Sequence, residues 1–243
     1  MRILVTNDDG VYSPGISLLA EAASHFGDVR IVAPDVEQSS MAHAVTATRP
    51  LRIRPARISH FDSWRVNGTP ADCVALGAHV WGEVDLVFSG INLGLNVGNS
   101  MWHSGTLAAA KQAALHGLRG IAFSAPFEGD ENDYGPIRPF LDRVITELLA
   151  MPDLPLLNVN FPMRPVGVTW TRQSVRHYDG RVFPTRDPLG REHFWFSPVP
   201  LDAAEEHTDR RAIEDNLVSI TPLRLDLTDH DALAQARGAV AAE

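Results

Sequence analysis

The chain has 243 residues, of which 44% are hydrophobic and 21% are charged, which is enough for one domain of ordinary size or for one domain with an extension. Its net charge of −9 argues against a broad surface for a nucleic-acid polymer, although a local site for a small anion stays compatible with it. The single cysteine, Cys73, excludes an internal disulfide framework and favours a cytoplasmic location, and no apolar run reaches the roughly 18 residues that span a membrane.

Short apolar runs alternate with helical patterns through the first two thirds of the chain. Strands are expected at residues 2–6, 29–34, 84–90, 120–125 and 154–162. Helices with capping residues or glycine ends are expected at residues 13–27, 69–82, 104–118 and 136–151. This alternation predicts an α/β fold with a doubly wound, Rossmann-like and mostly parallel sheet.

Two stretches break the alternation. In residues 47–70, apolar and polar residues alternate enough for a small β-hairpin. Beyond residue 161, the chain consists of short β-like segments interrupted by proline. We therefore expect a core over residues 1–161 and a β-rich C-terminal extension over residues 162–243 that forms one structural unit with the core. This extension is a candidate for subunit contact, and its last residues, 236–243, are expected to fray.

Oxygen-rich loops follow three of the expected strands. They comprise residues 7–10, residues 34–40 and residues 89–99. In open α/β sheets, ligands bind beyond the carboxyl ends of the strands, near the switch in strand order. We therefore expect these loops to meet at one edge of the sheet.

The first of these loops contains two adjacent carboxylates, Asp8 and Asp9, followed by Gly10, which permits a sharp turn. Nearby carboxylates together with hydroxyl and amide oxygens suit Mg²⁺ or Mn²⁺ better than zinc. A divalent cation also relieves the repulsion between the two carboxylates. An ordinary turn or helix cap is the alternative for the dipeptide alone, and the other oxygen-rich loops favour the metal.

The segments "NLGLNVGN" (residues 92–99) and "HSGTLAAAKQ" (residues 103–112) suggest a phosphate site. Asparagines can support left-handed turns, but their amides can also bind metal or phosphate. Ser104, Gly105 and Thr106 begin a helix, where free backbone N–H groups attract anions, although Ser104 is equally compatible with a simple N-cap. The glycine-rich dinucleotide motif, the P-loop and the nucleophile elbow are absent from the sequence, and the 10 histidines lack zinc-ligand spacing.

These motifs resemble the SurE family (stationary-phase survival protein E), whose members are metal-dependent 5′-nucleotidases. The resemblance is carried by "ILVTNDDG" with "SPGI", "VAPDVEQSS", "VNGTPADCVALG", "SGINLGLNVG" and "SGTLAAA". It continues through "DPLGREHFWF" and "TDRRAIEDNLVSITPLRLDLT" near the end of the chain.

The resemblance implies specific roles for residues of this chain. The implied metal ligands are Asp8, Asp9, Ser39 and Asn92, with Ser40 as the alternative to Ser39. The implied phosphate-binding residues are Asn96, Ser104, Gly105 and Thr106, and the implied catalytic residues are Asp8, Asp9 and Asn96. Many members have tyrosine where this chain has His103.

The resemblance implies a phosphomonoesterase that uses one Mn²⁺ or Mg²⁺ per subunit to hydrolyse nucleoside 5′-monophosphates. The resemblance also implies 3′-nucleotides and short polyphosphate as further substrates. Asp8 either orients and deprotonates a water molecule or attacks phosphorus itself, and the sequence leaves both routes open. The resemblance also implies a homodimer or tetramer in which the C-terminal part is exchanged between subunits.

Two other functions remain compatible with the motifs. A receiver-like signalling module also has an acidic pair after its first strand, but it needs a phosphoacceptor aspartate after a later strand. A non-catalytic, metal-dependent nucleotide-binding module would use the same ligands without turnover. Several residues of the extension could contact a nucleoside or could instead pack in a core or an interface. They are Trp170, Arg172, Arg176, His177, Phe194 and Trp195.

Overall fold

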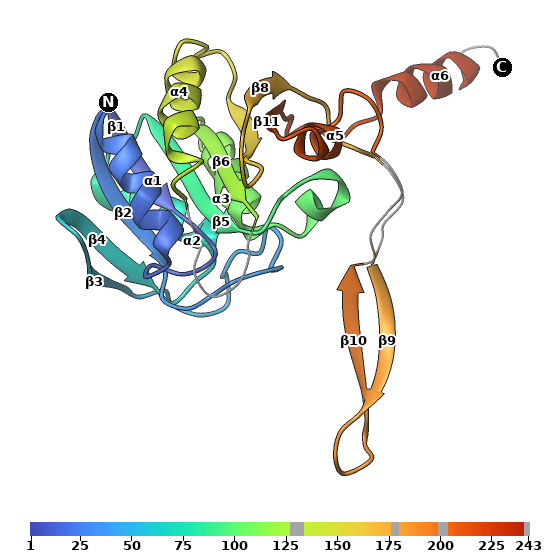
Figure 1. Cartoon of the computed structure of the whole chain (residues 1–243), viewed down its shortest axis with the longest axis horizontal. Coiled ribbons are helices and arrows are strands. Elements are labelled where there is room, and N and C mark those ends of the chain that lie inside the picture. The colour runs from blue at the N-terminus through green and yellow to red at the C-terminus, as the bar shows by residue number, and fades with distance from the viewer. Residues whose placement is uncertain (127–133, 176–179, 199–203, 241–243) are drawn as a thin grey trace.

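The computed structural model describes residues 1–126, 134–175, 180–198 and 204–240. A nine-stranded sheet of order β3-β4-β2-β1-β5-β6-β7-β11-β8 lies at the centre, with helices on both faces (Figure 1). The strands of this sheet are β1 (Arg2–Thr6), β2 (Asp28–Pro34), β3 (Ile53–Ile58), β4 (Phe61–Val66), β5 (Leu86–Leu93), β6 (Arg119–Ala125), β7 (Leu156–Asn160), β8 (Gly167–Trp170) and β11 (Leu217–Pro222). The helices are α1 (Pro14–Ser24), α2 (Pro70–Trp81), the 3₁₀ helix η1 (Gly98–Trp102), α3 (Gly105–Leu115), α4 (Arg138–Leu149), α5 (Asp209–Glu214) and α6 (His230–Val240).

The central strands bury both of their faces, as their continuous apolar runs predict. In β1, Ile3 and Val5 pack into the core beneath α1 and α4. Leu4 points to the opposite face and packs with Cys73 of α2 and Ala109 of α3. The predicted α/β class with a large, mostly parallel sheet is therefore confirmed.

Strand β1 lies at the point where the strand order reverses. The chain passes from β1 through α1 to β2 on one side, and later from β4 through α2 to β5 on the other side of β1. Both pairings of β1 are parallel, and Thr6 is opposite Ser89 at its end. The segments that follow β1, β2 and β5 consequently open onto one edge of the sheet, which is where such folds bind ligands.

The predicted hairpin within residues 47–70 is confirmed, because β3 and β4 pair antiparallel from Ile53 opposite Val66 to Ile58 opposite Phe61. The region after residue 161 has a mixed arrangement. β11 joins the central sheet antiparallel to β7, and β8 pairs parallel with β11. Two helices there, α5 and α6, were not expected. α6 continues to Val240, so residues 236–240 are helical rather than frayed, and residues 241–243 lie outside the described residues.

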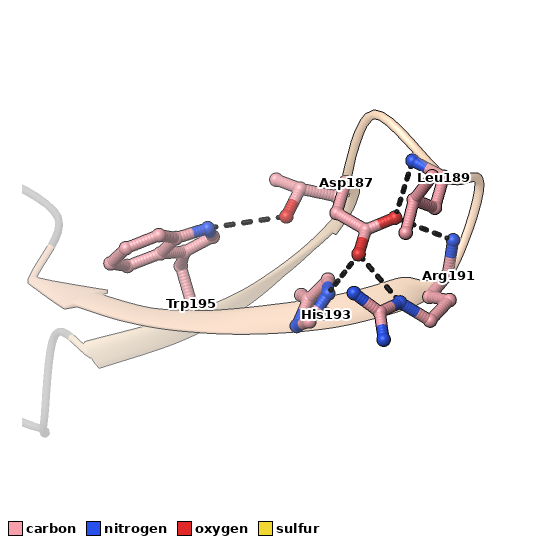
Figure 2. A network of polar contacts seen from close by, with 6 residues as sticks. Asp187, Leu189, Arg191, His193 and Trp195 are labelled. Carbon is pink, nitrogen blue, oxygen red and sulfur yellow. Dashed lines mark hydrogen bonds and ion pairs between the residues drawn. The ribbon is translucent and has the colours of Figure 1, made fainter.

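Strands β9 (Gly180–Arg186) and β10 (Glu192–Pro198) form a separate two-stranded hairpin that projects from the body of the protein (Figure 1). At its tip, Asp187 accepts hydrogen bonds from the backbone N–H groups of Leu189 and Arg191, each at 2.9 Å (Figure 2). Nε of Arg191 also donates to Asp187 at 2.7 Å. Hydrogen bonds from Arg191 lower the pKa of Asp187. These local contacts fix the turn of the hairpin without help from the central sheet.

Among the described residues, no helix combines the length and the apolar character needed to cross a membrane.

Candidate active site

The turn after β1 brings Asp8 and Asp9 to the carboxyl edge of the sheet. Gly10 has a φ of +97°, a conformation that glycine adopts without strain. Nδ2 of Asn7 donates to the carbonyl oxygen of Gly10 at 2.9 Å and to Oγ of Ser13 at 2.7 Å. Asp8 is buried and Asp9 is half-buried. The chain therefore leaves the extended geometry in which adjacent side chains point to opposite faces.

Burial makes both carboxylates harder to ionise. It raises the pKa of Asp8, although a hydrogen bond from Thr106 opposes this effect. Burial and, second, the charge of Asp8 raise the pKa of Asp9 to about 7. The backbone N–H of Leu93 donates to Oδ2 of Asp9 at 3.1 Å and only partly offsets this rise. A cation between these groups would stabilise their charged forms.

The predicted metal ligands border two neighbouring cavities. The larger one, of about 530 Å³, is lined in part by Asp8, Ser39, Ser40 and Asn92. The smaller one is lined by Asp9, Glu37, Ser39 and Leu93. Ser39 borders both cavities whereas Ser40 borders only the larger of these two, which favours Ser39 as the ligand.

The donor set fits a hard divalent cation. Nδ2 of Asn92 donates to the carbonyl oxygen of Gly94 at 2.7 Å, which leaves the amide oxygen of Asn92 for a ligand. Oγ of Ser39 donates to Glu37 at 2.7 Å and keeps its lone pairs for coordination. Within the described residues, no group of three or more His, Cys, Asp or Glu side chains could hold a metal ion. Two carboxylates supplemented by neutral oxygens match Mg²⁺ or Mn²⁺ rather than zinc.

The N-terminus of α3 lies directly against Asp8. Oγ1 of Thr106 donates to Oδ1 of Asp8 at 2.6 Å. A Cβ atom added to Gly105 would lie 2.8 Å from Cβ and 2.9 Å from Oδ2 of Asp8, so only glycine permits this approach. Ser104 caps the helix by accepting a hydrogen bond from the N–H of Leu107 at 3.0 Å, and its own hydrogen stays available. The structure thus brings the predicted phosphate-binding residues Ser104, Gly105 and Thr106 next to the predicted metal ligands.

A buried polar network behind Asn96 was not identified from the sequence. It consists of Ser124 at the end of β6 and Asn158 and Asn160 in β7, all fully buried. Oδ1 of Asn160 accepts from the backbone N–H of Asn96 at 2.8 Å, and Nδ2 of Asn158 donates to the carbonyl oxygen of Asn96 at 2.8 Å. Polar residues at the carboxyl ends of two otherwise apolar strands were the signal that could have indicated it.

Asp209 is a further residue that sequence reasoning missed. It is fully buried at the start of α5 and accepts hydrogen bonds from the backbone N–H groups of Gly98, at 2.8 Å, and Ser174, at 3.0 Å. Burial raises the pKa of Asp209. Asp209 thereby ties the loop between Asn92 and Ser104 to the C-terminal part of the chain.

The nucleoside-binding candidates of the extension are dispersed. Trp170 donates from Nε1 to Glu147 at 3.3 Å and does not border the larger cavity. Phe194 and Trp195 are each 66% exposed on β10, and their neighbour Phe196 does line that cavity together with His103. Arg172 does not line it either, and Arg176 and His177 lie outside the described residues.

Comparisons with known proteins find relatives along almost the whole chain. The family model for Survival protein SurE matches residues 3–180. The protein named 5′-nucleotidase SurE 1 from Thermus thermophilus is 44% identical, over 98% of this chain and 97% of its own. 5′-nucleotidase SurE from Deinococcus radiodurans is 43% identical, over 96% of this chain and 91% of its own. The crystal structure of the SurE protein from Aquifex aeolicus superposes with a TM-score of 0.83 at 38% identity, covering 97% of this chain and 98% of that one.

Proposed function

The chain belongs to the SurE family, and from this premise we propose that it is a divalent-metal-dependent 5′-nucleotidase. It hydrolyses nucleoside 5′-monophosphates to nucleoside and phosphate. The observation that carries this function is the position of Asp8, which belongs to the oxygen donor set and also accepts the 2.6 Å hydrogen bond from Thr106 at the start of α3. One residue therefore joins a metal site to a phosphate site.

Asp8, Asp9, Ser39 and Asn92 are the residues that would hold one Mn²⁺ or Mg²⁺ ion. Such an ion, when bound, polarises a phosphoryl oxygen and lowers the pKa of a water molecule. The backbone of Gly105 and the hydroxyl group of Ser104 donate hydrogen bonds to the phosphoryl oxygens, and the positive end of the α3 dipole adds to their effect. Asn96 lines the larger cavity together with Asp8 and Ser104, so it lies in the cavity in which the phosphoryl group would bind.

Asp8 orients the attacking water and accepts its proton. The oxygen of the water then bonds to phosphorus, the bond from phosphorus to the 5′ oxygen breaks, and the 5′ oxygen takes a proton from solvent in the cavity. Direct attack by Asp8 on phosphorus is the competing route. The hydrogen bond from Thr106 to Oδ1 and the close approach of Gly105 restrict the Asp8 carboxylate, which favours the role of oriented base.

The receiver-like alternative lacks its phosphoacceptor, since β5 places the amide of Asn92 rather than a carboxylate at its carboxyl end. We also propose that the protein acts on 3′-nucleotides and short polyphosphate, that it is cytoplasmic, and that it forms a homodimer or tetramer through the region after residue 161. The projecting β9–β10 hairpin, with Phe194 and Trp195 each 66% exposed, supports a subunit contact through this region.

Turnover of nucleoside monophosphates and p-nitrophenyl phosphate with and without divalent ions tests the proposed function. We expect activity with Mn²⁺ or Mg²⁺, loss of activity in EDTA, and recovery when excess Mn²⁺ is added. Turnover that ignores EDTA would contradict metal dependence. A protein that binds nucleotide but shows no turnover with any divalent ion would instead be the non-catalytic binding module.

The stabilisation of the protein by Mn²⁺ is expected to grow with pH. The pKa of Asp9 rises from its ordinary value of 3.8 to about 7 in the metal-free fold, so the folded chain holds this proton more tightly than the unfolded chain. The metal-free protein therefore loses stability as the pH rises from about 4 through about 7, and above that range Mn²⁺ binds without displacing the proton. Thermal unfolding at about pH 5.5 and about pH 8, with and without Mn²⁺, measures this effect.

Asp9→Asn serves as the matched variant, because it removes the titrating group from the same position. We expect the metal-free stability of this variant to change less over this pH range than that of the wild type, and the change that remains comes from Asp8, whose pKa is also raised by burial. Equal stabilisation of the wild type by Mn²⁺ at both pH values would contradict the raised pKa of Asp9.

A further inference from the structure

Asn96 directs all of its N–H groups into the protein. Its backbone N–H donates to Oδ1 of Asn160 at 2.8 Å. Its side-chain Nδ2 donates to Oγ of Ser124 at 2.9 Å and to Oγ1 of Thr106 at 3.3 Å. A hydrogen bond from Asn96 to phosphate would therefore require the loss of a buried hydrogen bond, which is costly.

The orientation of the Asn96 amide is fixed by its partners. The hydroxyl group of Thr106 has a single hydrogen, and it donates this hydrogen to Oδ1 of Asp8 at 2.6 Å because a carboxylate can only accept. Oγ1 of Thr106 must then accept from Asn96, so the nitrogen and not the oxygen of the amide faces it. Oδ1 of Asn96 accepts no hydrogen bond from the described residues, and Asn96 lines the larger cavity. This oxygen can therefore accept a hydrogen bond from a molecule in the cavity.

The backbone of Asn96 is held independently of its side chain. Nδ2 of Asn160 donates to the carbonyl oxygen of Asn96 at 3.2 Å, and Nδ2 of Asn158 donates to the same oxygen at 2.8 Å. Both partners are fully buried in β7. Truncation of the Asn96 side chain should consequently leave the loop in place.

We propose that Asn96 is a catalytic residue that holds the attacking water as a hydrogen-bond acceptor. A phosphomonoester dianion has no hydrogen to offer Oδ1 and is repelled by it, whereas water has two hydrogens. Asp8 and Asn96 both hydrogen-bond to Thr106 and both line the larger cavity, and the proposed water lies between their two acceptor groups. This role rests on the proposed nucleotidase function.

The two acceptors divide the hydrogens of the water between them. Asp8 takes one proton as the oxygen bonds to phosphorus, and the bond to the 5′ oxygen breaks. The second hydrogen stays on the attacking oxygen, held by Asn96, and leaves as part of the product phosphate. The lone pair that attacks is thereby aimed at phosphorus.

Kinetic and binding measurements on Asn96→Ala and the similarly sized Asn96→Leu test this assignment. We expect kcat to fall about 100-fold in both variants, while KM and the Kd for inorganic phosphate, measured by calorimetry with Mn²⁺, change less than about twofold. Ser104→Gly is the contrasting control, because it removes a proposed phosphate donor at an N-cap position that tolerates glycine. Its Kd for phosphate should rise about tenfold.

Any of the following results would overturn the proposed role of Asn96. Weaker phosphate binding in the Asn96 variants would show that Asn96 donates to phosphate. Weaker Mn²⁺ binding by electron paramagnetic resonance would make Asn96 a metal ligand, and an unchanged kcat would leave it without a catalytic role. Loss of folding in both variants, seen by thermal unfolding, would make Asn96 structural. A wild-type protein without activity would overturn the proposed function itself, which these variant results alone cannot do.

Discussion

Asp8→Asn is expected to lower kcat for nucleotide hydrolysis about 1,000-fold while the protein stays folded. The amide can still accept the hydrogen bond that Thr106 donates to Asp8 at 2.6 Å, so the contact with α3 is retained. It cannot take a proton from water, and it is a weaker ligand for a divalent cation. Because burial raises the pKa of Asp8, the metal-free variant should also be at least as stable as the metal-free wild type above neutral pH.

Steady-state kinetics with Mn²⁺, together with thermal unfolding of the same samples, measures both effects. Asp35→Asn is the matched control. Asp35 follows β2 at the same edge of the sheet as Asp8, which follows β1, but Asp35 lines neither of the two cavities that the predicted ligands border. A variant at position 8 that keeps more than about a tenth of the wild-type kcat would be incompatible with Asp8 as the base.

Gly15→Ala is expected to lower the free energy of unfolding by about 3 kcal/mol or more. A Cβ atom at this position would lie 2.0 Å from the carbonyl oxygen of Ile91, which is buried backbone and cannot move aside like the end of a flexible side chain. Helix α1 would have to shift away from β5. Since Asn92 follows Ile91, we also expect the affinity for Mn²⁺ to fall.

Urea unfolding of Gly15→Ala and Gly238→Ala separates this clash from a general effect of replacing glycine. Gly238 lies in the exposed part of α6, and a Cβ atom there would have no neighbour within 4 Å. Its replacement should be neutral or stabilise the protein by up to about 1 kcal/mol. A Gly15→Ala protein as stable as the wild type would refute the close contact between α1 and β5.

The edge of the sheet that holds the site could be predicted because its signals are local. An apolar run that ends at Thr6 and is followed by Asn7, Asp8, Asp9 and Gly10 marks a buried strand that ends in a turn. The serine at position 104 before an alanine-rich stretch marks the start of a helix. The rule for open α/β sheets then places the ends of such strands together without any knowledge of side-chain contacts.

The supporting network could not be predicted because its contacts are distant in sequence. Asn96 and Asn160 are 64 positions apart, and Gly98 and Asp209 are 111 positions apart. No local pattern fixes such pairs. The direction in which the Asn96 amide points depends on the single hydrogen of Thr106, which only the three-dimensional arrangement reveals.

The insertion of β11 between β7 and β8 illustrates the same limit at the level of the fold. Residues 216–228 have the composition of a strand, but composition does not identify a strand's neighbours. Helix α5 is only six residues long, and its capping residue Thr208 lies within a polar stretch, so its pattern was too short to recognise.

The most direct test of the metal site is anomalous diffraction from a crystal grown with Mn²⁺. We expect one strong peak at the carboxyl edge of β1 and β5, about 2.2 Å from oxygens of Asp8, Asp9 and Asn92, with Oγ of Ser39 completing the protein ligands. A crystal in which Mn²⁺ binds elsewhere, or in which Asp8 and Asp9 turn away from each other and from Asn92, would contradict the site.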